Sequence, residues 1–104
     1  MAKKGYWVAH VDVSDPEAYK SYVAANAAAF RKFGARFLVR GGAHEVTEGE
    51  VRARTVVIEF RDFATALECY RSDEYQAAKA LRTSASVGDV VVIEGYDGPQ
   101  PTAA

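Results

Sequence analysis

Hydrophobic and polar residues recur along the chain with two different periods, and these periods divide it into strands and helices. Residues 5–13, GYWVAHVDV, are rich in valine and aromatic side chains and predict a strand. In residues 14–34 the apolar side chains recur at steps of three and four, as they do on one face of a helix, and Ser14 or Asp15 is the expected N-cap. The same patterns predict strands at 35–41, 51–61 and 89–96 and helical segments at 63–71 and 72–85, with Asp62 and Ser72 as the expected N-caps of the two helical segments.

The predicted order is strand, helix, strand, strand, helix, strand. Short connections and right-handed crossovers then favour an α+β fold, a ferredoxin-like βαββαβ sandwich with a four-stranded antiparallel sheet. In this arrangement the first and third strands are central, and the second and fourth lie at the edges. We expect a single domain over residues 1–104, structured from about 5 to 97 and followed by a flexible tail at 98–104, where prolines and small residues gather.

Each predicted strand carries two rows of side chains, because successive residues point to opposite faces of a sheet. One row is purely apolar and is expected to lie under the helices. It holds Trp7, Ala9, Val11, Val13, Phe37, Val39, Val56, Ile58, Phe60, Val91 and Ile93. The other row mixes charged residues with apolar ones, namely Val8, Leu38, Val57, Val90 and Val92. A solvated antiparallel face should be polar, so we expect the same face of a second copy to cover this one in a homodimer.

Composition and charge exclude several classes of function. The chain has 104 residues with 13 basic and 14 acidic side chains, and it lacks a Lys/Arg run that would neutralise the phosphates of a nucleic acid. No apolar run approaches the roughly 20 residues of a membrane span, and the first residues do not read as a signal peptide. We therefore expect neither a nucleic-acid partner nor a membrane. With Cys69 as its one cysteine, the chain is expected in the reducing cytoplasm.

Four blocks of sequence, in this order and spacing, resemble one known family. The blocks SDPEAYKSY, LVRGGA, VVIEF and CYRSDEYQAAKALR are similar to the family catalogued as domain of unknown function 1330, over residues 6–96. The resemblance implies a dimeric α/β barrel, in which two ferredoxin-like subunits pack sheet to sheet around a cavity. No reaction is established for the family, and its distant relatives include antibiotic-biosynthesis monooxygenases, muconolactone isomerases and haem-degrading enzymes. The family's characteristic positions map onto Tyr19, Tyr22, Arg40, Gly41, Gly42, Glu59, Phe60, Tyr70, Ser72, Tyr75 and Arg82.

The candidate catalytic residues are His10 and Glu59, on the two central strands. Both are expected on the face toward the second subunit, within hydrogen-bond reach, so that Glu59 orients an imidazole acting as general base. Glu94 is expected to flank His10 from the fourth strand. The alternative is a structural charge pair that stabilises the sheet or the interface.

The candidate ligand-binding residues are arginines and tyrosines. Arg40, with Arg36 two residues earlier on the same face, is placed to bind the carboxylate of a small anionic ligand; the alternative is an ion pair with Glu59 or with the partner subunit. The tyrosines either border the cavity with their hydroxyls or only pack, and Arg82 either binds an anion or caps its helix. The full set is Arg40, Tyr19, Tyr22, Tyr70, Tyr75 and Arg82.

The paired glycines of RGGAHEV could belong to a phosphate-binding loop or to a bend in a strand. Such a loop needs backbone amides at the start of a helix, whereas here a strand is expected to continue, so Gly41 and Gly42 are interpreted as a bulge that bends an edge strand. The two histidines, His10 and His44, lack ligand-like spacing, and we predict no metal and no cofactor. Cys69 is predicted to be a small buried apolar residue rather than a nucleophile.

Three classes of function fit these observations. The first is a cofactor-free enzyme of isomerase, monooxygenase or lyase type that acts on a small carbonyl or aromatic anion. The second is a non-catalytic protein that binds a small anionic metabolite in the same cavity. The third is a structural homodimer without a ligand. The first two share a small-molecule cavity and are favoured.

Overall fold

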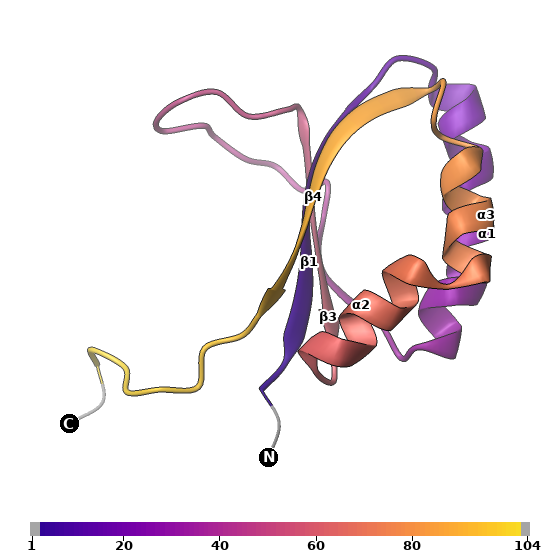
Figure 1. Cartoon of the computed structure of the whole chain (residues 1–104). Helices are drawn as coiled ribbons and strands as arrows, with labels where there is room; N and C mark the ends of the chain where they lie inside the picture. Colours follow the sequence, from indigo (N-terminus) through magenta and orange to yellow (C-terminus); the bar gives the residue numbers. More distant parts are fainter. Residues whose placement is uncertain (1–2, 103–104) are drawn as a thin grey trace.

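The computed structural model describes residues 3–102 and contains a four-stranded antiparallel sheet with three helices (Figure 1). The strands are β1 (Gly5–Val13), β2 (Arg36–Arg40), β3 (Arg54–Phe60) and β4 (Ser86–Glu94), and the helices are α1 (Pro16–Lys32), α2 (Phe63–Arg71) and α3 (Asp73–Ala80). The strand order is β2-β3-β1-β4, which confirms the predicted ferredoxin-like topology with β1 and β3 in the centre. Residues 1–2 and 103–104 lie outside the described residues, and the flexibility of the tail at 98–104 stays a prediction.

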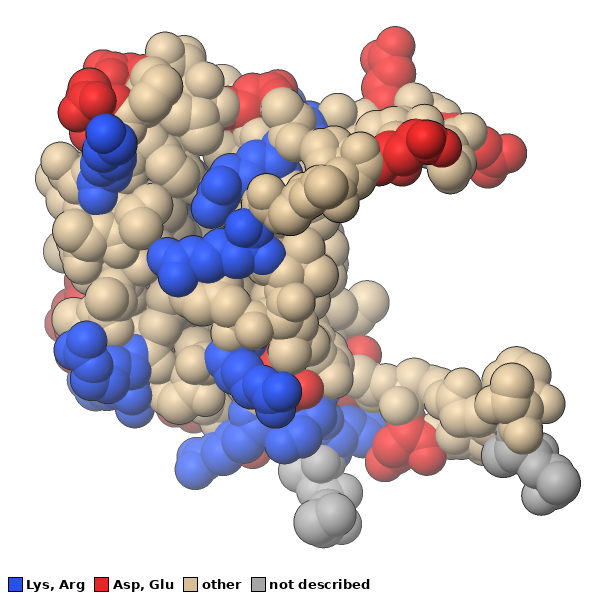
Figure 2. All heavy atoms as spheres, turned by 180° about the vertical axis from the view of Figure 1, so that it is seen from behind, with Lys and Arg blue, Asp and Glu red and all other residues tan. Residues whose placement is uncertain are grey.

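All three helices lie on one side of the sheet (Figure 1). The connection between β2 and β3 and the segment after β4 extend from the other side (Figure 1). The same two projections flank the bare side of the sheet in the space-filling view, and acidic side chains gather on one of them (Figure 2). The sheet face that the helices leave uncovered is called the open face below. Its central side chains are Val8, Val57, Val91 and Ile93.

Side-chain caps fix where the helices begin. Asp15 is the N-cap of α1 and accepts a hydrogen bond from the Ala18 amide at 3.2 Å. Asp62 caps α2 through the Thr65 amide at 2.7 Å, and Ser72 caps α3 through the Tyr75 amide at 3.1 Å. These bonds satisfy amides that the first turn of a helix leaves without a partner. The predicted caps at Asp62 and Ser72 are confirmed, and Asp15 rather than Ser14 caps α1.

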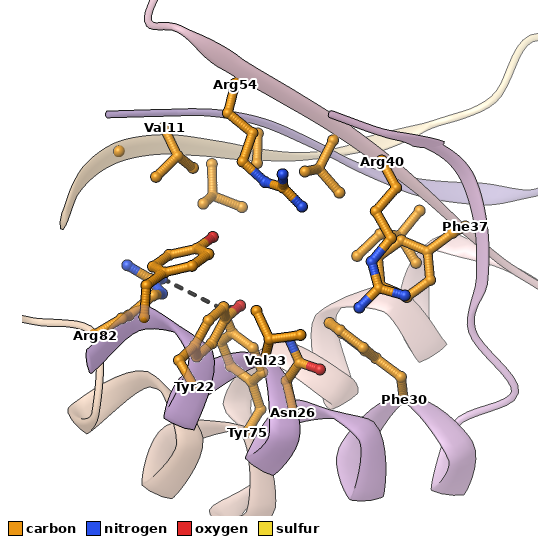
Figure 3. A pocket seen from close by; sticks show the side chains of 16 residues that line it. Val11, Tyr22, Val23, Asn26, Phe30, Phe37, Arg40, Arg54, Tyr75 and Arg82 are labelled. Carbon is orange, nitrogen blue, oxygen red and sulfur yellow. Dashed lines mark hydrogen bonds between the residues drawn. The ribbon is translucent and has the colours of Figure 1, made fainter. Parts of the chain in front are cut away.

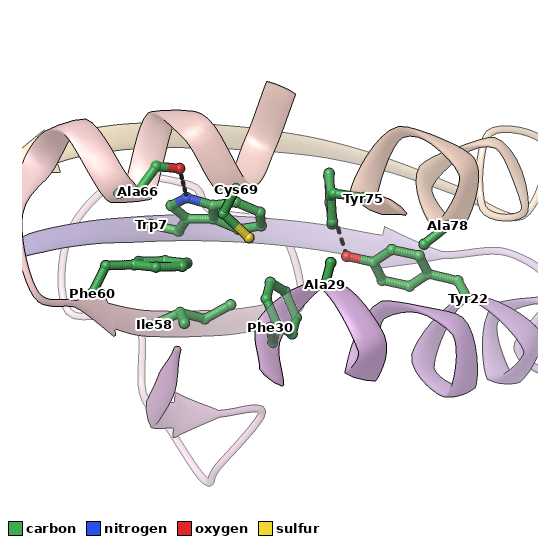
Figure 4. Close-up of a cluster of buried hydrophobic side chains, with 10 residues drawn as sticks. All are labelled: Trp7, Tyr22, Ala29, Phe30, Ile58, Phe60, Ala66, Cys69, Tyr75 and Ala78. Carbon is green, nitrogen blue, oxygen red and sulfur yellow. Dashed lines mark hydrogen bonds between the residues drawn. The ribbon is translucent and has the colours of Figure 1, made fainter. Parts of the chain in front are cut away.

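Trp7 lies at the centre of the core, between β1 and the helices (Figure 4). Its ring contacts Phe30 of α1 and Tyr75 of α3, with centroids 5.3 Å and 4.8 Å away, and both pairs meet edge to face. Its indole nitrogen donates a hydrogen bond of 2.9 Å to the Ala66 carbonyl of α2. One side chain therefore ties the sheet to all three helices. Cys69 is fully buried beside it, and burial raises the pKa of its thiol to about 12, as expected for a structural cysteine.

The predicted side-chain rows are wrong for β4. In the register with β1, Trp7 pairs with Val92 and Val8 pairs with Val91. Val90 and Val92 therefore face the helices, while Val91 and Ile93 lie on the open face with exposed fractions of 54% and 50%. The run Val90–Ile93 is apolar at every position, so the sequence does not show which of its side chains face the helices. Only pairing with β1 decides which way each side chain points.

A bulge also reverses the end of β2. Phe37 pairs with Ile58, but Val39 pairs with Val57 and Arg40 with Val56, so the register shifts by one residue at Leu38. Arg40 consequently turns toward the helices, and Val39 turns to the open face. The predicted bulge at Gly41 and Gly42 is wrong in position, since the strand ends at Arg40. The expected continuation of the strand after the glycines is wrong as well.

Replacing Trp7 by alanine should lower the free energy of unfolding by about 3–5 kcal/mol, because it empties the centre of the core and removes the bond to Ala66. Chemical denaturation followed by circular dichroism measures the change. Val51→Ala, at a side chain that is 50% exposed, is the matched control and should stay within about 0.5 kcal/mol of the parent. A Trp7 variant as stable as the control would contradict this view of the core.

Candidate functional site

A cavity of about 50 Å³ lies between α1 and the helix-facing side of the sheet (Figure 3). The cavity exists because α2 packs directly on the strands, whereas α1 packs mainly on α3 and contacts the strands through Phe30. Ala9 and Gly88, the small members of the strand rows below α1, leave the floor open. A single water needs roughly 10–15 Å³ by this measure, so the space holds several waters or a small ligand.

Positively charged and hydroxyl groups converge on the cavity, while its remaining walls are apolar. The lining includes no Asp, Glu or His side chain. Among residues 3–102, no ion pair engages any of its three arginines. The polar members of the lining are Tyr19, Tyr22, Asn26, Arg40, Arg54, Tyr75 and Arg82. A half-enclosed site with this composition favours a negatively charged occupant.

Arg54 is the central cation of the cavity. It stands at the start of β3 and enters from the sheet side (Figure 3). Its Nε is buried and, among residues 3–102, has no hydrogen-bond partner. A buried guanidinium donor without an acceptor is costly, and a ligand oxygen would remove that cost.

Gly41 leaves the space in which the Arg54 side chain lies. Its φ is +67°, and its amide donates to the Thr55 carbonyl at 2.9 Å, which closes the end of β2. A Cβ at this position would overlap the Arg54 guanidinium. The first glycine of the RGG motif therefore serves the site by making room for an arginine, and its backbone conformation is one that glycine adopts without strain.

Arg40 lies at the rim of the cavity, where its guanidinium stacks over the Phe37 ring at 4.0 Å from the centroid. The expectation that Arg40 and Arg36 share a face is wrong, because the bulge at Leu38 lies between them. Arg36 stays on the open face opposite Glu59. The expected position of Arg40 on the face toward the second subunit is wrong, because the bulge places it at the helix-side cavity, and its contact with a ligand stays a prediction.

Tyr22, Tyr75 and Arg82 form a chain of hydrogen bonds along the helical wall (Figure 3). The two tyrosine oxygens are 2.8 Å apart, and Arg82 Nη2 donates to the Tyr75 oxygen at 3.3 Å. Burial raises the pKa of the Tyr75 hydroxyl well above its usual value; Tyr22 adds to this rise and Arg82 opposes it. The raised pKa keeps the Tyr75 hydroxyl protonated at neutral pH.

Tyr19 borders the same cavity near two of the arginines. Burial raises the pKa of its hydroxyl above the usual value, and the neighbouring Tyr22 adds to the rise. The positive charges of Arg54 and Arg82 act in the opposite direction. Tyr19 is therefore a neutral donor close to both guanidinium groups.

The predicted hydrogen-bonded pair of His10 and Glu59 is wrong. His10 stands opposite Thr55, whereas Glu59 stands opposite Tyr6, which is four residues earlier in β1. At about 3.3 Å per residue the two are separated by roughly 13 Å. Glu59 is instead 3.4 Å from the Tyr6 hydroxyl, which donates to it. Any catalytic role of either residue stays a prediction, but Glu59 does not orient the imidazole.

His10 belongs to a shallow polar groove on the open side of the sheet. Its Nδ1 is 3.0 Å from the Thr55 hydroxyl, and Asp89 of β4 stands opposite it. Arg52 bridges that Asp89 at 3.1 Å and Asp12 at 3.0 Å, which ties the β2–β3 connection to the sheet. The expected flanking of His10 by Glu94 is wrong, since Glu94 pairs with Gly5 at the far end of β1.

Five of the six predicted ligand-binding residues meet in the helix-side cavity. They are Tyr19, Tyr22, Arg40, Tyr75 and Arg82. Tyr70 does not line it and packs against Trp7 instead, with ring centroids 5.6 Å apart. Sequence reasoning missed Asn26 and Arg54. The sequence did contain a signal for Arg54. It lies two residues before Val56, so strand alternation places this charged side chain in the apolar row that faces the helices.

Among residues 3–102, no three His, Cys, Asp or Glu side chains lie close enough together to hold a metal ion. No helix within the same range is both long and apolar enough to cross a membrane.

With the sheet order β2-β3-β1-β4 and the helices on one side, the chain has a ferredoxin-like fold. It belongs to the family Domain of unknown function (DUF1330), whose model matches residues 4–96. A comparison with curated protein sequences finds no match.

Solved structures share this fold at low sequence identity. A protein of unknown function from Rhodopseudomonas palustris is 17% identical with a TM-score of 0.73, over 94% of this chain and 86% of that chain. SnoaB, a cofactor-independent oxygenase from Streptomyces nogalater, is 14% identical with a TM-score of 0.61, over 99% and 100%. A dimeric protein of unknown function and ferredoxin-like fold from Bacteroides fragilis is 14% identical with a TM-score of 0.59, over 88% and 95%. At these identities the similarity shows the fold alone.

The raised pKa of Tyr75 predicts a loss of stability at high pH. Unfolding exposes a hydroxyl that ionises near its model value of 10.0, whereas the folded protein holds the proton. The contribution is complete below pH 10 and falls as pH rises above it, by at most about 1.4 kcal/mol per pH unit. Urea unfolding at a series of pH values should show a shallower alkaline decline for Tyr75→Phe. Tyr96→Phe, at a 70% exposed side chain, should keep the parental slope; equal slopes in all three proteins would refute the assignment.

Proposed function

We propose that this protein binds a small organic anion in the cavity between α1 and the sheet. The observation that carries the proposal is the buried Arg54 Nε without a partner. Because the lining holds three arginines and no acidic side chain, the positive charge inside the cavity has no protein counter-ion there. An anionic group from outside supplies one, and a fork-shaped guanidinium binds a carboxylate with two parallel hydrogen bonds.

The apolar part of the lining defines the body of this ligand. Val11, Val23, Phe30, Phe37 and Val90 surround the charged groups with aliphatic and aromatic surface. Small-molecule sites combine such a surface with a few convergent polar groups. We therefore propose a compact carboxylate or a comparable oxyanion with an aliphatic or aromatic body.

A second candidate function is cofactor-free catalysis on the bound anion. The observation that favours it is the same cationic cavity, because Arg54 and Tyr19 are placed to stabilise an enolate or a phenolate that forms on a substrate. The lining supplies no carboxylate or imidazole as a base, so such a substrate would have to be acidic itself. The fold of a cofactor-independent oxygenase is similar. Turnover of a bound acid separates this candidate from simple binding.

We also propose that two copies pair through the open face. Val91 and Ile93 are about half exposed there, and Leu38 and Val39 on β2 are 44% and 41% exposed. An apolar sheet face of this kind is unusual in a monomer and is self-complementary across a two-fold axis. The two projections beside it leave a concave surface between them (Figure 2). A similar fold is dimeric in the Bacteroides fragilis protein.

Replacing Arg54 by methionine tests the anion site. Titration calorimetry with benzoate should show an affinity loss of about 10-fold or more, because the central cation is gone. Without ligand the variant should melt at the same or a higher temperature, since it no longer buries an unpaired donor. Arg36→Met, on the open face, is the control and should bind benzoate like the parent protein. Unchanged binding by the Arg54 variant would sink the proposal, as would failure of the parent to bind any small acid.

A charge on the open face tests the dimer. Val57→Asp should convert the protein to monomers in light scattering at micromolar concentration, because pairing would bury a carboxylate without a partner. Ala28→Asp, on the exposed surface of α1, should leave the assembly unchanged. A parent protein that is monomeric in this measurement would contradict the proposed pairing outright.

A further inference from the structure

The Tyr22–Tyr75 pair has one hydroxyl hydrogen more than it uses. The two oxygens are 2.8 Å apart, so one hydroxyl donates to the other. Arg82 donates to Tyr75 at 3.3 Å and has no acceptor to offer in return. Apart from the two tyrosine oxygens themselves, no acceptor among residues 3–102 is hydrogen-bonded to either hydroxyl. One of the two hydrogens therefore lacks an acceptor within the described protein.

The surplus hydrogen belongs to Tyr22. Tyr75 is 1% exposed and enclosed by aromatic rings, and it receives the hydrogen bond from Arg82. A hydroxyl that accepts from a cation becomes a stronger donor, so Tyr75 gives its hydrogen to Tyr22. Tyr22 is 8% exposed and lines the cavity, where its own hydrogen remains available. The direction of donation is then Arg82 to Tyr75 to Tyr22 and on into the cavity.

Two of the donors that the described protein leaves without an acceptor, Arg54 Nε and the Tyr22 hydroxyl, come from opposite walls of the cavity. Arg54 comes from the sheet, and Tyr22 comes from α1 on the helical side (Figure 3). Arg54 carries a positive charge and Tyr22 offers a hydroxyl. An anionic acceptor therefore suits Arg54, and a neutral oxygen suits Tyr22. A ligand that satisfies only one of them leaves the other without a partner.

We propose that the ligand carries two acceptor groups, an anionic group bound by Arg54 and a ketone or comparable oxygen bound by the Tyr22 hydroxyl. The proposal rests on the anion site described above and narrows its ligands to oxo acids and similar bifunctional acids. Arg82 acts through the two tyrosines as a positioning residue, because it sets the direction in which their hydrogens point.

Pairs of acids that differ by one ketone test the proposal. The probes are pyruvate with propionate, levulinate with pentanoate, and para-acetylbenzoate with para-isopropylbenzoate, which place the ketone at increasing distance from the carboxylate. Dissociation constants are measured by calorimetry for the parent protein, Tyr22→Phe and Tyr75→Phe. In the parent, at least one ketone should tighten binding by about 2- to 10-fold, the value of one neutral hydrogen bond.

The two tyrosine variants are expected to differ. In Tyr22→Phe the ratio of the two dissociation constants within that pair should fall to about one, because the donor to the ketone is lost. Tyr75→Phe keeps the Tyr22 hydroxyl and should retain a preference for the ketone. In the parent complex, the ¹³C resonance of the bound ketone should lie downfield of its position in an aprotic solvent, which reports the hydrogen bond even if the Tyr22 variant does not fold.

The failures of the two proposals look different. Acids that bind the parent protein with no ketone preference in any pair, or a preference that survives in Tyr22→Phe, overturn the second acceptor and leave the anion site standing. If none of the six acids binds, the anion site itself is refuted, and the inference about Tyr22 falls with it.

Discussion

Trp7 touches all three helices from the centre of the sheet, and the position of each helix depends on those contacts. Its indole bonds to the Ala66 carbonyl of α2, and its ring meets Tyr75 of α3 at 4.8 Å. Tyr75 in turn holds Tyr22 of α1 through a hydrogen bond of 2.8 Å. The aromatic cluster thus fills one half of the space between the sheet and the helices. Over the other half it keeps α1 away from the strands. The cavity is the space that remains, and its size follows from where these rings stop.

The open cavity leaves Arg54 without a hydrogen-bond partner among residues 3–102 for its buried Nε, which lowers the stability of the free protein. A buried guanidinium nitrogen without a partner lowers the stability of the free protein by about 1–3 kcal/mol. Such a cost is typical of binding sites, where groups are held ready for a ligand rather than for the fold. Gly41 fits the same view, because its missing side chain leaves the place that the Arg54 guanidinium occupies. The motif that suggested a phosphate loop therefore contributes to an anion site by a different route, through space for an arginine instead of backbone amides.

The two faces of the sheet have different proposed functions. The helix side holds the anion site, and the open face with Val57, Val91 and Ile93 is the proposed contact with a second copy. The β2–β3 connection belongs to the open side and is anchored by Arg52, which bridges Asp12 and Asp89. Arg40 crosses from one side to the other only because of the bulge at Leu38. One inserted residue in an edge strand thus decides whether a positive charge serves the cavity or the interface.

Sequence by itself determined the order of elements, the caps at Asp62 and Ser72, and the central position of β1 and β3. These features follow from local periodicity, capping chemistry and general rules of chain connection, which act over short stretches. It also identified Tyr19, Tyr22, Arg40, Tyr75 and Arg82 as candidate ligand residues. Tertiary structure alone decided the register, which separates His10 from Glu59 by four residues along β1, and the phase of the uniformly apolar β4. It also decided on which side of the sheet the candidates meet, because a one-residue shift reverses every later side chain and local sequence holds no record of that shift.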